Sequence, residues 1–330
     1  MTTSSANTKA ITIFEGPDGA GKSTLAQEYA QLTRARYVHH GPYKQVGDGL
    51  GRMFVESMLP ALLGYQDVVL DRCWLSEPIY ADAFRGGNDR VGMARARLLD
   101  RLALRCGAVV VKCLPPWAFV KETFNGRKAE EYLDDDAQLL KVYGDYQHGL
   151  NTQLHEVEHD YTKHLNKPLS LVVMNDVKPM VDMMRSKSPC HSTRINTAGN
   201  WDAPIVVVGE DFGEHKNNDA MYQWPFGSLN GNGCSFWLAR ELEEAGISEQ
   251  SLLWVNADEL ARVPEFFDWH AGKRFITLGQ QAMTVVDGRA DTTPVSHPQY
   301  WKRFQSGQPY PLIKVLKDEL AEVFARPSVG

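Results

Sequence analysis

Hydrophobic residues occur along the chain in short, dense runs that alternate with longer amphipathic stretches. The first runs are rich in Val, Ile and Leu and are predicted to be buried strands: Ala10 to Gly16, Asp67 to Arg72, Gly107 to Leu114 and Ser170 to Asp176. Helical patterns lie between them, one beginning at Lys22 and another covering Val91 to Arg105. Continuous apolar strands separated by helices indicate a parallel sheet with helices on both faces. The sequence therefore predicts an α/β fold.

A second series of the same kind follows a polar stretch without periodicity at residues 186–200. Its predicted strands are Pro204 to Asp211, Ser251 to Asp258 and Lys273 to Gly279, and its last helix is the amphipathic tail from Pro311. We therefore expect a smaller second α/β domain. The expected boundaries are a disordered start at 1–9, a first domain at 10–185, a linker at 186–200 and a second domain at 201–330.

The length of 330 residues suits two domains, and a composition of 43% hydrophobic and 23% charged residues excludes fibrous and wholly disordered proteins. No apolar run approaches the roughly 18 residues of a membrane span, and the first residues do not form a signal peptide. Five scattered cysteines form no CxxC pair. We expect a cytoplasmic protein with no membrane partner and no disulfide-linked partner. The net charge of −6 argues against a surface that is basic throughout, but it allows a local basic groove.

A phosphate-binding loop follows the first predicted strand. Residues 16–23 read GPDGAGKS, which matches G-x-x-x-x-G-K-[ST] between a strand and a helix. In such loops the backbone N–H groups surround a phosphate, the lysine reaches the β- and γ-phosphates, and the hydroxyl holds Mg²⁺. We therefore expect ATP and Mg²⁺ as cofactors. The candidate cofactor-binding residues are Gly16, Asp18, Gly19, Ala20, Gly21, Lys22, Ser23 and Thr24.

The segments FEGPDGAGKST at 14–24 and DRCWLSEPIY at 71–80 resemble the thymidylate kinases and their phage relatives, over about residues 10–185. The resemblance implies a five-stranded parallel sheet, a mobile lid and transfer of the γ-phosphate of ATP to a pyrimidine nucleotide. It places Asp71 near the metal or the attacking oxygen. It also assigns Arg72, Ser76 and Tyr80 to the acceptor site. Independently, a carboxylate that ends a strand, like Asp71, fits a metal-steadying role, so Ser23 and Asp71 are the candidate metal ligands.

Arg127 and Lys128 lie where such kinases carry their lid. An arginine that closes over the transferring phosphoryl group stabilises its charge, so the candidate catalytic residues are Lys22, Asp71 and Arg127. A solvated, charged start of a helix remains the alternative for Arg127.

Residues 39–44 read HHGPYK where thymidylate kinases have an Arg-Glu-Pro-Gly stretch. With SEPIYADAFRGG, this segment resembles the phage kinases that phosphorylate the hydroxymethyl group of 5-hydroxymethyluracil in DNA, and His40 is a candidate acceptor-site residue. The expected partner is DNA that contains a modified pyrimidine. Two alternatives stay open: a kinase of a free pyrimidine monophosphate, and a non-catalytic DNA-binding protein that uses ATP as a switch.

Segments of the second domain, among them GEDFG at 209–213 and VSHPQYWKRF at 295–304, resemble the uracil-DNA glycosylase superfamily. The resemblance implies that Glu210, Asp211 and His297 flank an extruded base. Phe212 replaces an expected proline, and the two cysteines after residue 185, Cys190 and Cys234, are too few for a four-cysteine iron–sulfur cluster. We therefore expect binding of a base or of DNA rather than glycosylase activity. Trp224 and Phe226 are expected either to stack on a base or to lie in the core.

The segment HEVEH at 155–159 matches the H-E-x-x-H pattern of zinc proteases. We expect a polar helix there and an accidental match, because no third ligand is apparent.

Overall fold

The computed structural model describes residues 9–41, 43, 49–127, 133, 135–187, 194–211, 224–229, 231, 233–305 and 307–325, without the side chain of Phe324. Residues 1–8 of the predicted disordered start, Lys128, Cys190 and Phe212 lie outside these residues. The chain forms two compact units. Residues 9–92 and 106–187 form the first unit, and residues 93–105 and 194–325 form the second.

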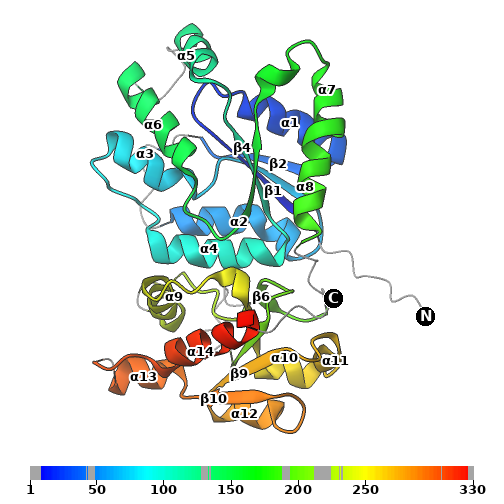
Figure 1. Ribbon diagram of the computed structural model, residues 1–330, viewed down its shortest axis with the longest axis vertical. Coiled ribbons are helices and arrows are strands. Elements are labelled where there is room, and N and C mark those ends of the chain that lie inside the picture. The colour runs from blue at the N-terminus through cyan, green and yellow to red at the C-terminus, as the bar shows by residue number, and fades with distance from the viewer. Residues whose placement is uncertain are drawn as a thin grey trace, which may run out of the picture. The chain divides into compact units, whose positions relative to one another are not determined.

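The first unit contains a five-stranded parallel sheet with the strand order β2-β3-β1-β4-β5 (Figure 1). Its strands are β1 (Ile11–Glu15), β2 (Arg36–His39), β3 (Val68–Asp71), β4 (Val109–Cys113) and β5 (His155–His159). Every residue of β1, β3 and β4 is buried, as expected for strands that are covered on both faces. The predicted α/β class and parallel sheet are therefore confirmed.

Helices flank this sheet. α1 (Lys22–Thr33) packs on β1, β2 and β3, with α7 (Leu169–Val172) and α8 (Lys178–Arg185) near it. α2 (Leu50–Leu62) packs on β3, and α6 (Asp136–His148) contacts both α3 (Ser76–Phe84) and α5 (Trp117–Gly126). No helix in the described part of the chain combines the length and the apolar character that crossing a membrane requires.

The prediction of a strand at residues 170–176 is wrong. These residues belong to α7 and to the π-helix η2 (Val173–Val177), which leads into α8. Val173, Val177 and Val181 are fully buried at a spacing of four residues, so they form one face of a helix. A short apolar run fits a buried helix as well as it fits a buried strand, and periodicity alone did not separate the two.

The prediction of a polar helix at residues 155–159 is also wrong, because this segment is the edge strand β5. Val157 and His159 are buried while Glu158 is exposed, which is the alternation of a strand. Residues four apart in a strand are separated by about 13 Å, too far for His155 and His159 to share one zinc ion. Within the described residues, no group of three His, Cys, Asp or Glu side chains could hold a metal ion.

The second unit contains a sheet with the order β10-β9-β7-β8-β6. Its strands are β6 (Thr197–Gly199), β7 (Ile205–Gly209), β8 (Leu252–Asn256), β9 (Arg274–Leu278) and β10 (Thr292–Val295). All are parallel except β6, which pairs antiparallel with β8 and lies inside the expected linker. The helices that follow these strands are α9 (Cys234–Glu244), α10 (Ala257–Arg262), α11 (Phe266–Trp269), α12 (Gln280–Val286), α13 (Pro298–Phe304) and α14 (Pro311–Ala325).

Helix α4 (Met93–Arg105) belongs to the second unit by its contacts, although its sequence lies inside the stretch 10–185. Arg97, Arg101 and Arg105 recur every four residues and therefore share one face of the helix. Arg101 donates to both carboxylate oxygens of Glu249, at 3.1 and 2.6 Å, and Arg105 donates to the carbonyl oxygen of Thr197 at 2.6 Å. The side chains of Arg101 and Glu249 are fully buried. Charge-assisted hydrogen bonds thus hold α4 in the second unit.

Candidate functional site

The glycine-rich loop between β1 and α1 has a backbone that only glycine accommodates at its tightest points. Gly16 and Gly19 have φ angles of 151° and 80°. A Cβ atom on Gly16 would lie 2.4 Å from the carbonyl oxygen of Cys113, and one on Gly19 would lie 2.7 Å from that of Val120. The loop therefore lies directly against β4 and α5. α1 begins at Lys22 with no side-chain cap, so the N-terminus of a twelve-residue helix faces the loop and suits a phosphate.

Lys22 is buried at the start of α1. Its Nζ atom donates to the carbonyl oxygen of Pro17 at 3.4 Å and lies 3.7 Å from Asp18 Oδ1. Burial and the nearby charge of Arg72 lower the pKa of Lys22 from its ordinary value. Ser23, half-buried, follows Lys22 into the same pocket, whereas Thr24 is exposed.

Asp18, Arg72 and Tyr80 form a compact polar group beside Lys22. The Arg72 guanidinium donates to Asp18 Oδ1 and lies 4.7 Å from the centre of the Tyr80 ring, while the Tyr80 hydroxyl donates to Asp18 Oδ2 at 3.0 Å. Burial would raise the pKa of Asp18, but the charges of Arg72 and Lys22 outweigh it and hold that pKa below its ordinary value. Arg72 has a φ angle of 68°, a strained backbone conformation that recurs at functional sites.

Asp71 ends β3 and is fully buried. Its Oδ2 atom accepts hydrogen bonds from the Tyr37 hydroxyl at 2.7 Å and from His39 Nδ1 at 2.8 Å. Burial would raise the pKa of Asp71, but the bond from His39, the charge of Lys22 and the hydroxyls of Ser23 and Tyr37 lower it instead. Its other oxygen, Oδ1, is buried and makes no hydrogen bond within the described residues. An ionised carboxylate with one unsatisfied oxygen beside a serine hydroxyl fits Mg²⁺, which prefers oxygen ligands.

A pocket of about 220 Å³ opens beside this group, within the first unit. The residues that the sequence predicted for the site and that line this pocket are Asp18, Gly19, Lys22, Ser23, His40, Arg72, Ser76, Tyr80 and Arg127. Asp71 is buried beside these residues but does not itself line the pocket. Arg127, at the end of α5, is close enough to contribute to the low pKa of Asp18. The structure thus brings together residues from four separate segments of the sequence.

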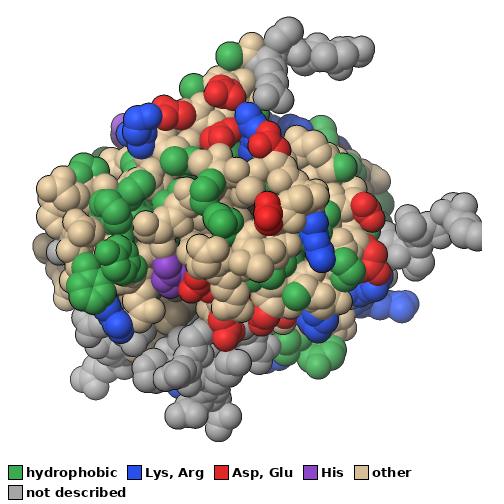
Figure 2. Space-filling view, turned by 90° about the horizontal axis from the view of Figure 1, so that it is seen from below, with side chains coloured by type: hydrophobic (Ala, Val, Ile, Leu, Met, Phe, Trp, Pro, Cys, Tyr) green, Lys and Arg blue, Asp and Glu red, His purple; other side chains and the backbone are tan. Residues whose placement is uncertain are grey.

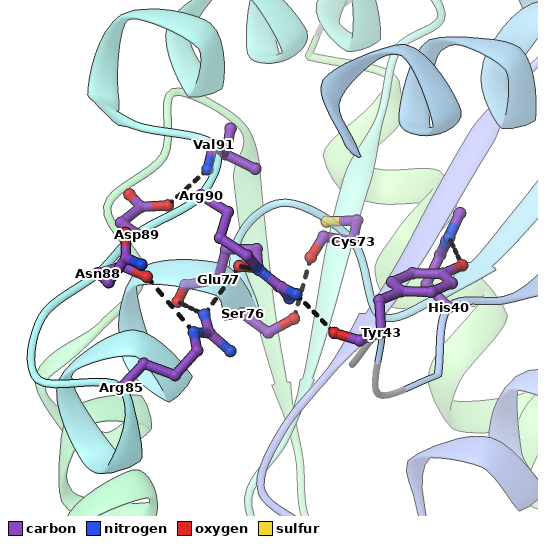
Figure 3. A network of polar contacts seen from close by, with 10 residues as sticks. All are labelled: His40, Tyr43, Cys73, Ser76, Glu77, Arg85, Asn88, Asp89, Arg90 and Val91. Carbon is purple, nitrogen blue, oxygen red and sulfur yellow. Dashed lines mark hydrogen bonds and ion pairs between the residues drawn. The ribbon is translucent and has the colours of Figure 1, made fainter. Parts of the chain in front are cut away.

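A second polar group, formed by Glu77, Arg85 and Arg90, also lines the pocket and was not predicted from the sequence (Figure 3). Glu77, in the first turn of α3, accepts hydrogen bonds from Arg85 at 2.8 Å and from Arg90 at 2.6 and 3.0 Å. Arg90 also donates to the carbonyl oxygen of Tyr43 at 2.5 Å. Glu77 lies within the segment DRCWLSEPIY at 71–80, but nothing in the sequence spacing connects it to Arg85 and Arg90.

His40 lies at the edge of the same wall. Its Nδ1 atom is 2.8 Å from the Tyr43 hydroxyl, and its ring packs edge-on against Phe54, with ring centres 4.9 Å apart. Burial and the neighbouring His39 lower the pKa of His40 to about 4, so the ring is neutral at pH 7. Ser76, by contrast, donates to the carbonyl oxygen of Cys73 at 2.9 Å.

The second unit has its own group of polar residues at the carboxyl ends of its parallel strands. Glu210 follows β7, and its Oε1 atom accepts a hydrogen bond from the backbone of Gln281 at 3.2 Å. The charge of Glu210 acts on His297, which follows β10, although burial is the larger effect and lowers the pKa of His297. Asp211 is exposed beside Glu210. Open α/β sheets bind ligands at this edge, so the three residues lie where a ligand would be expected.

Trp224 and Phe226 bear on the expected base-binding role. Trp224 is buried, at 2% exposure, and therefore does not offer a free face for stacking. The Phe226 ring packs on Trp254, with ring centres 5.2 Å apart. Of the two expected roles, stacking on a base or packing in the core, the structure shows Trp224 in the core.

Neither a scan against models of protein families nor a search of curated proteins found a match. Solved structures similar to this chain include the YorR protein from Bacillus subtilis in complex with phosphorylated GDP (20% identity, TM-score 0.42, 55% of this chain and 100% of that chain). They also include deoxyadenosine kinase from M. mycoides with bound dCTP (16%, 0.33, 51% and 99%) and an unliganded sugar kinase from Janibacter sp. HTCC2649 (17%, 0.31, 52% and 98%). These likenesses are remote and cover about half of this chain.

Proposed function

We propose that this protein is an ATP-dependent kinase that transfers the γ-phosphate to a pyrimidine acceptor bound beside the phosphate loop. One observation carries the proposal: Asp18 connects the phosphate loop to Arg72 and Tyr80, which form the acceptor wall. It lies 3.7 Å from Lys22 on one side, and on the other it accepts hydrogen bonds from Arg72 and Tyr80. A phosphate loop that served only as a nucleotide switch would not need acceptor-binding residues connected to its lysine through Asp18.

Each part of the pocket has a role in this reaction. Lys22 and Arg127 supply positive charge where the transferring oxygens accumulate negative charge. Ser23 and Asp71 would hold Mg²⁺, which neutralises charge on the triphosphate when it is bound. The wall of Arg72 and Tyr80 orients the acceptor. The acceptor oxygen forms a bond to the γ-phosphorus, the bond from that phosphorus to the β-phosphate oxygen breaks, and ADP leaves. When the acceptor is a hydroxyl group, its proton is released as well.

We favour the hydroxymethyl group of 5-hydroxymethyluracil in DNA as the acceptor. Two features support it: the segment that holds His40 differs from the nucleotide-binding stretch of thymidylate kinases, and Glu210, Asp211 and His297 of the second unit lie at a ligand-binding edge. In this proposal the second unit, which resembles the uracil-DNA glycosylases in sequence, holds a base or the DNA strand.

A free pyrimidine monophosphate is the second candidate, and the charge of the molecule favours it. The net charge is −6, and the face in Figure 2 carries acidic and basic side chains interspersed rather than a continuous basic surface. Nucleic-acid binding depends on clusters of basic side chains, so the net negative charge argues for a small acceptor.

Labelling of defined acceptors tests the proposal. The protein is incubated with γ-labelled ATP and with DNA containing 5-hydroxymethyluracil, with thymine DNA, with dTMP, or with the free hydroxymethyl nucleotide. We expect label in the first DNA alone. Label confined to dTMP or to the free nucleotide supports the second candidate, and ATP-dependent DNA binding without any labelling supports the non-catalytic switch.

A further inference from the structure

Arg72 and Cys73 form a turn between β3 and α3 and belong to neither element. The backbone N–H of Arg72 still donates to the carbonyl oxygen of Phe14 at 3.0 Å, but the φ angle of Arg72 is 68°. This conformation is costly for a residue with a Cβ atom, and it persists only where surrounding contacts require it. Arg72 belongs to the acceptor wall, so those contacts decide where its guanidinium lies.

Side chains hold both backbone groups of Cys73. Its N–H donates to Glu15 Oε1 at 2.8 Å, and its carbonyl oxygen accepts from the Ser76 hydroxyl at 2.9 Å. The contact with Ser76 is drawn in Figure 3. Ser76 is only three residues further along the chain, whereas Glu15 is 58 positions away, at the end of β1. Glu15 is therefore the contact that anchors this turn to the sheet.

The carboxyl group of Glu15 is itself held at both oxygens. Its Oε2 atom accepts a hydrogen bond from the hydroxyl of Tyr146, in α6, at 2.8 Å. Glu15 and Tyr146 are fully buried, and neither is among the described residues that line the pocket. Burying a carboxyl group costs free energy unless donors satisfy it, and here a backbone N–H and a phenol do so. A side chain outside the pocket thus connects β1, α6 and the turn that carries Arg72.

We propose that Glu15 is a positioning residue that, through the N–H of Cys73, holds Arg72 in the conformation that its role in the acceptor wall requires. The inference rests on the kinase function proposed above and adds a residue to the same site. In this conformation the Arg72 guanidinium donates to Asp18 and lies 4.7 Å from the centre of the Tyr80 ring. Misplacement of a reacting group by about 1 Å can lower a rate by about a hundredfold. Loss of Glu15 should therefore affect the acceptor without any direct contact between them.

Two tyrosines of α6 provide a matched pair of variants. Tyr146→Phe removes the hydroxyl that holds Glu15, whereas Tyr143→Phe removes a buried hydroxyl that donates to the carbonyl oxygen of Pro115 at 3.0 Å. The experiment measures kcat/KM for each acceptor that the wild-type protein labels among 5-hydroxymethyluracil DNA, dTMP and the free hydroxymethyl nucleotide. A nucleotide titration measures the Kd of ATP.

We expect Tyr146→Phe to lower kcat/KM for the acceptor by about fivefold, the effect of one buried hydrogen bond. The Kd of ATP should stay within about twofold of the wild-type value, because Tyr146 reaches Arg72 and not the nucleotide. Tyr143→Phe should leave both quantities within that range.

Variants of Glu15 itself separate positioning from proton transfer. Glu15→Ala removes the acceptor for the N–H of Cys73 and should lower kcat/KM by about a hundredfold. Glu15→Gln keeps an oxygen for that N–H, and its amide can donate to the Tyr146 oxygen, so it should retain at least about one-third of the wild-type value. A folded but inactive Glu15→Gln would mean that the carboxyl group takes part in the chemistry, which overturns the inference. Thermal unfolding checks that each variant is folded, and if Glu15→Ala does not fold, the tyrosine pair decides.

The outcomes distinguish this inference from the proposed function. If the wild-type protein labels an acceptor but Tyr146→Phe and Tyr143→Phe behave alike, the kinase function stands and the positioning role of Glu15 fails. A rise in the Kd of ATP that matches the loss of kcat/KM also overturns this role, because it indicates general damage to the phosphate loop. If the wild-type protein labels no acceptor, both proposals fail.

Discussion

The two units both bury charged side chains, but they bury them at different ends of their sheets. In the first unit, Lys22, Asp18 and Arg72 lie at the carboxyl ends of β1 and β3 and line a pocket. In the second unit, the most deeply buried charges are Arg101 of α4 and Glu249, which precedes the amino end of β8. The carboxyl ends of its strands carry Glu210 and His297.

The difference shows that buried charge does not by itself identify a reactive site. A buried pair whose groups are fully satisfied, such as Arg101 and Glu249, holds the fold together. A buried group that also lines a cavity at the carboxyl ends of parallel strands can meet a ligand. In the first unit, buried charged groups line a cavity at the carboxyl ends of the strands. In the second unit, the most deeply buried charges lie away from that edge. Variants of the two networks should therefore affect different measurements.

The largest effect is expected from Lys22→Ala. If Lys22 stabilises the transferring phosphoryl group as proposed, loss of its charge should lower kcat by roughly a thousandfold or more. The fold should persist, because Asp18 keeps its partners Arg72 and Tyr80. Turnover is measured with labelled ATP and folding by thermal unfolding. A folded variant with wild-type turnover would remove the loop from the mechanism.

Next in size is Arg101→Met, which should destabilise the protein by roughly 3–5 kcal/mol because it leaves the carboxylate of Glu249 buried without its main partner. Denaturant unfolding measures the change. The control is Arg240→Met, which removes an exposed arginine 3.6 Å from Glu244 and should cost less than about 1 kcal/mol. If Arg101→Met folds as well as wild type but loses phosphate transfer, the contrast between the two networks is false.

A smaller effect concerns acid stability and His270. This ring is buried against Trp201 and Phe266, with ring centres 4.5 and 4.3 Å away, and burial with the charge of Lys273 lowers the pKa of His270 from 6.5 to about 3. The unfolded chain therefore binds a proton that the folded chain does not, so this stability is complete above pH 6.5 and decreases as the pH falls towards 3.

The variant His270→Phe should remove that dependence. The free energy of unfolding of His270→Phe minus that of wild type should be about 2 kcal/mol larger at pH 5 than at pH 7. Unfolding curves at the two pH values measure this. His40 and His159, whose pKa values are also lowered by burial, to about 4, stay in both proteins and cancel from the comparison. Parallel pH dependences in the two proteins would contradict a neutral, buried His270.

The smallest effect is expected from His297→Ala. If the carboxyl ends of the second sheet hold DNA, loss of one hydrogen-bonding side chain should weaken DNA binding by about fivefold, or roughly 1 kcal/mol. ATP binding should not change. Fluorescence anisotropy with a labelled oligonucleotide measures the first, and nucleotide titration measures the second. Unchanged DNA affinity would leave the second unit without a demonstrated ligand.

The sequence predicted those features that depend on local spacing. The loop from Gly16 to Ser23 and the strand that ends at Asp71 are continuous motifs, and the structure has a glycine turn and a buried carboxylate at these positions. The edge strands β2 and β10 were not predicted, because they are short, are only partly buried and have no strong apolar signal.

Contacts between distant residues were beyond local reasoning. Arg101 and Glu249 are 148 positions apart, and the arginines of α4 have the spacing of an ordinary basic helix. Glu77 lies within a recognised segment, but it pairs with Arg85 and Arg90, which follow the helix in an irregular stretch. The error at residues 170–176 has a different origin, since valines at a spacing of four were hidden in a run that is apolar almost throughout.

Helix α4 also determines how this protein can be divided. The chain enters the second unit for residues 93–105, returns to the first, and enters the second again after residue 187. A single cut between the two sheets therefore leaves one fragment with an arginine-bearing helix that has lost its partners, and the other with Glu249 buried and unpaired. Separate production of the second unit requires a rearranged gene, in which the segment encoding α4 is joined to residues 194–325.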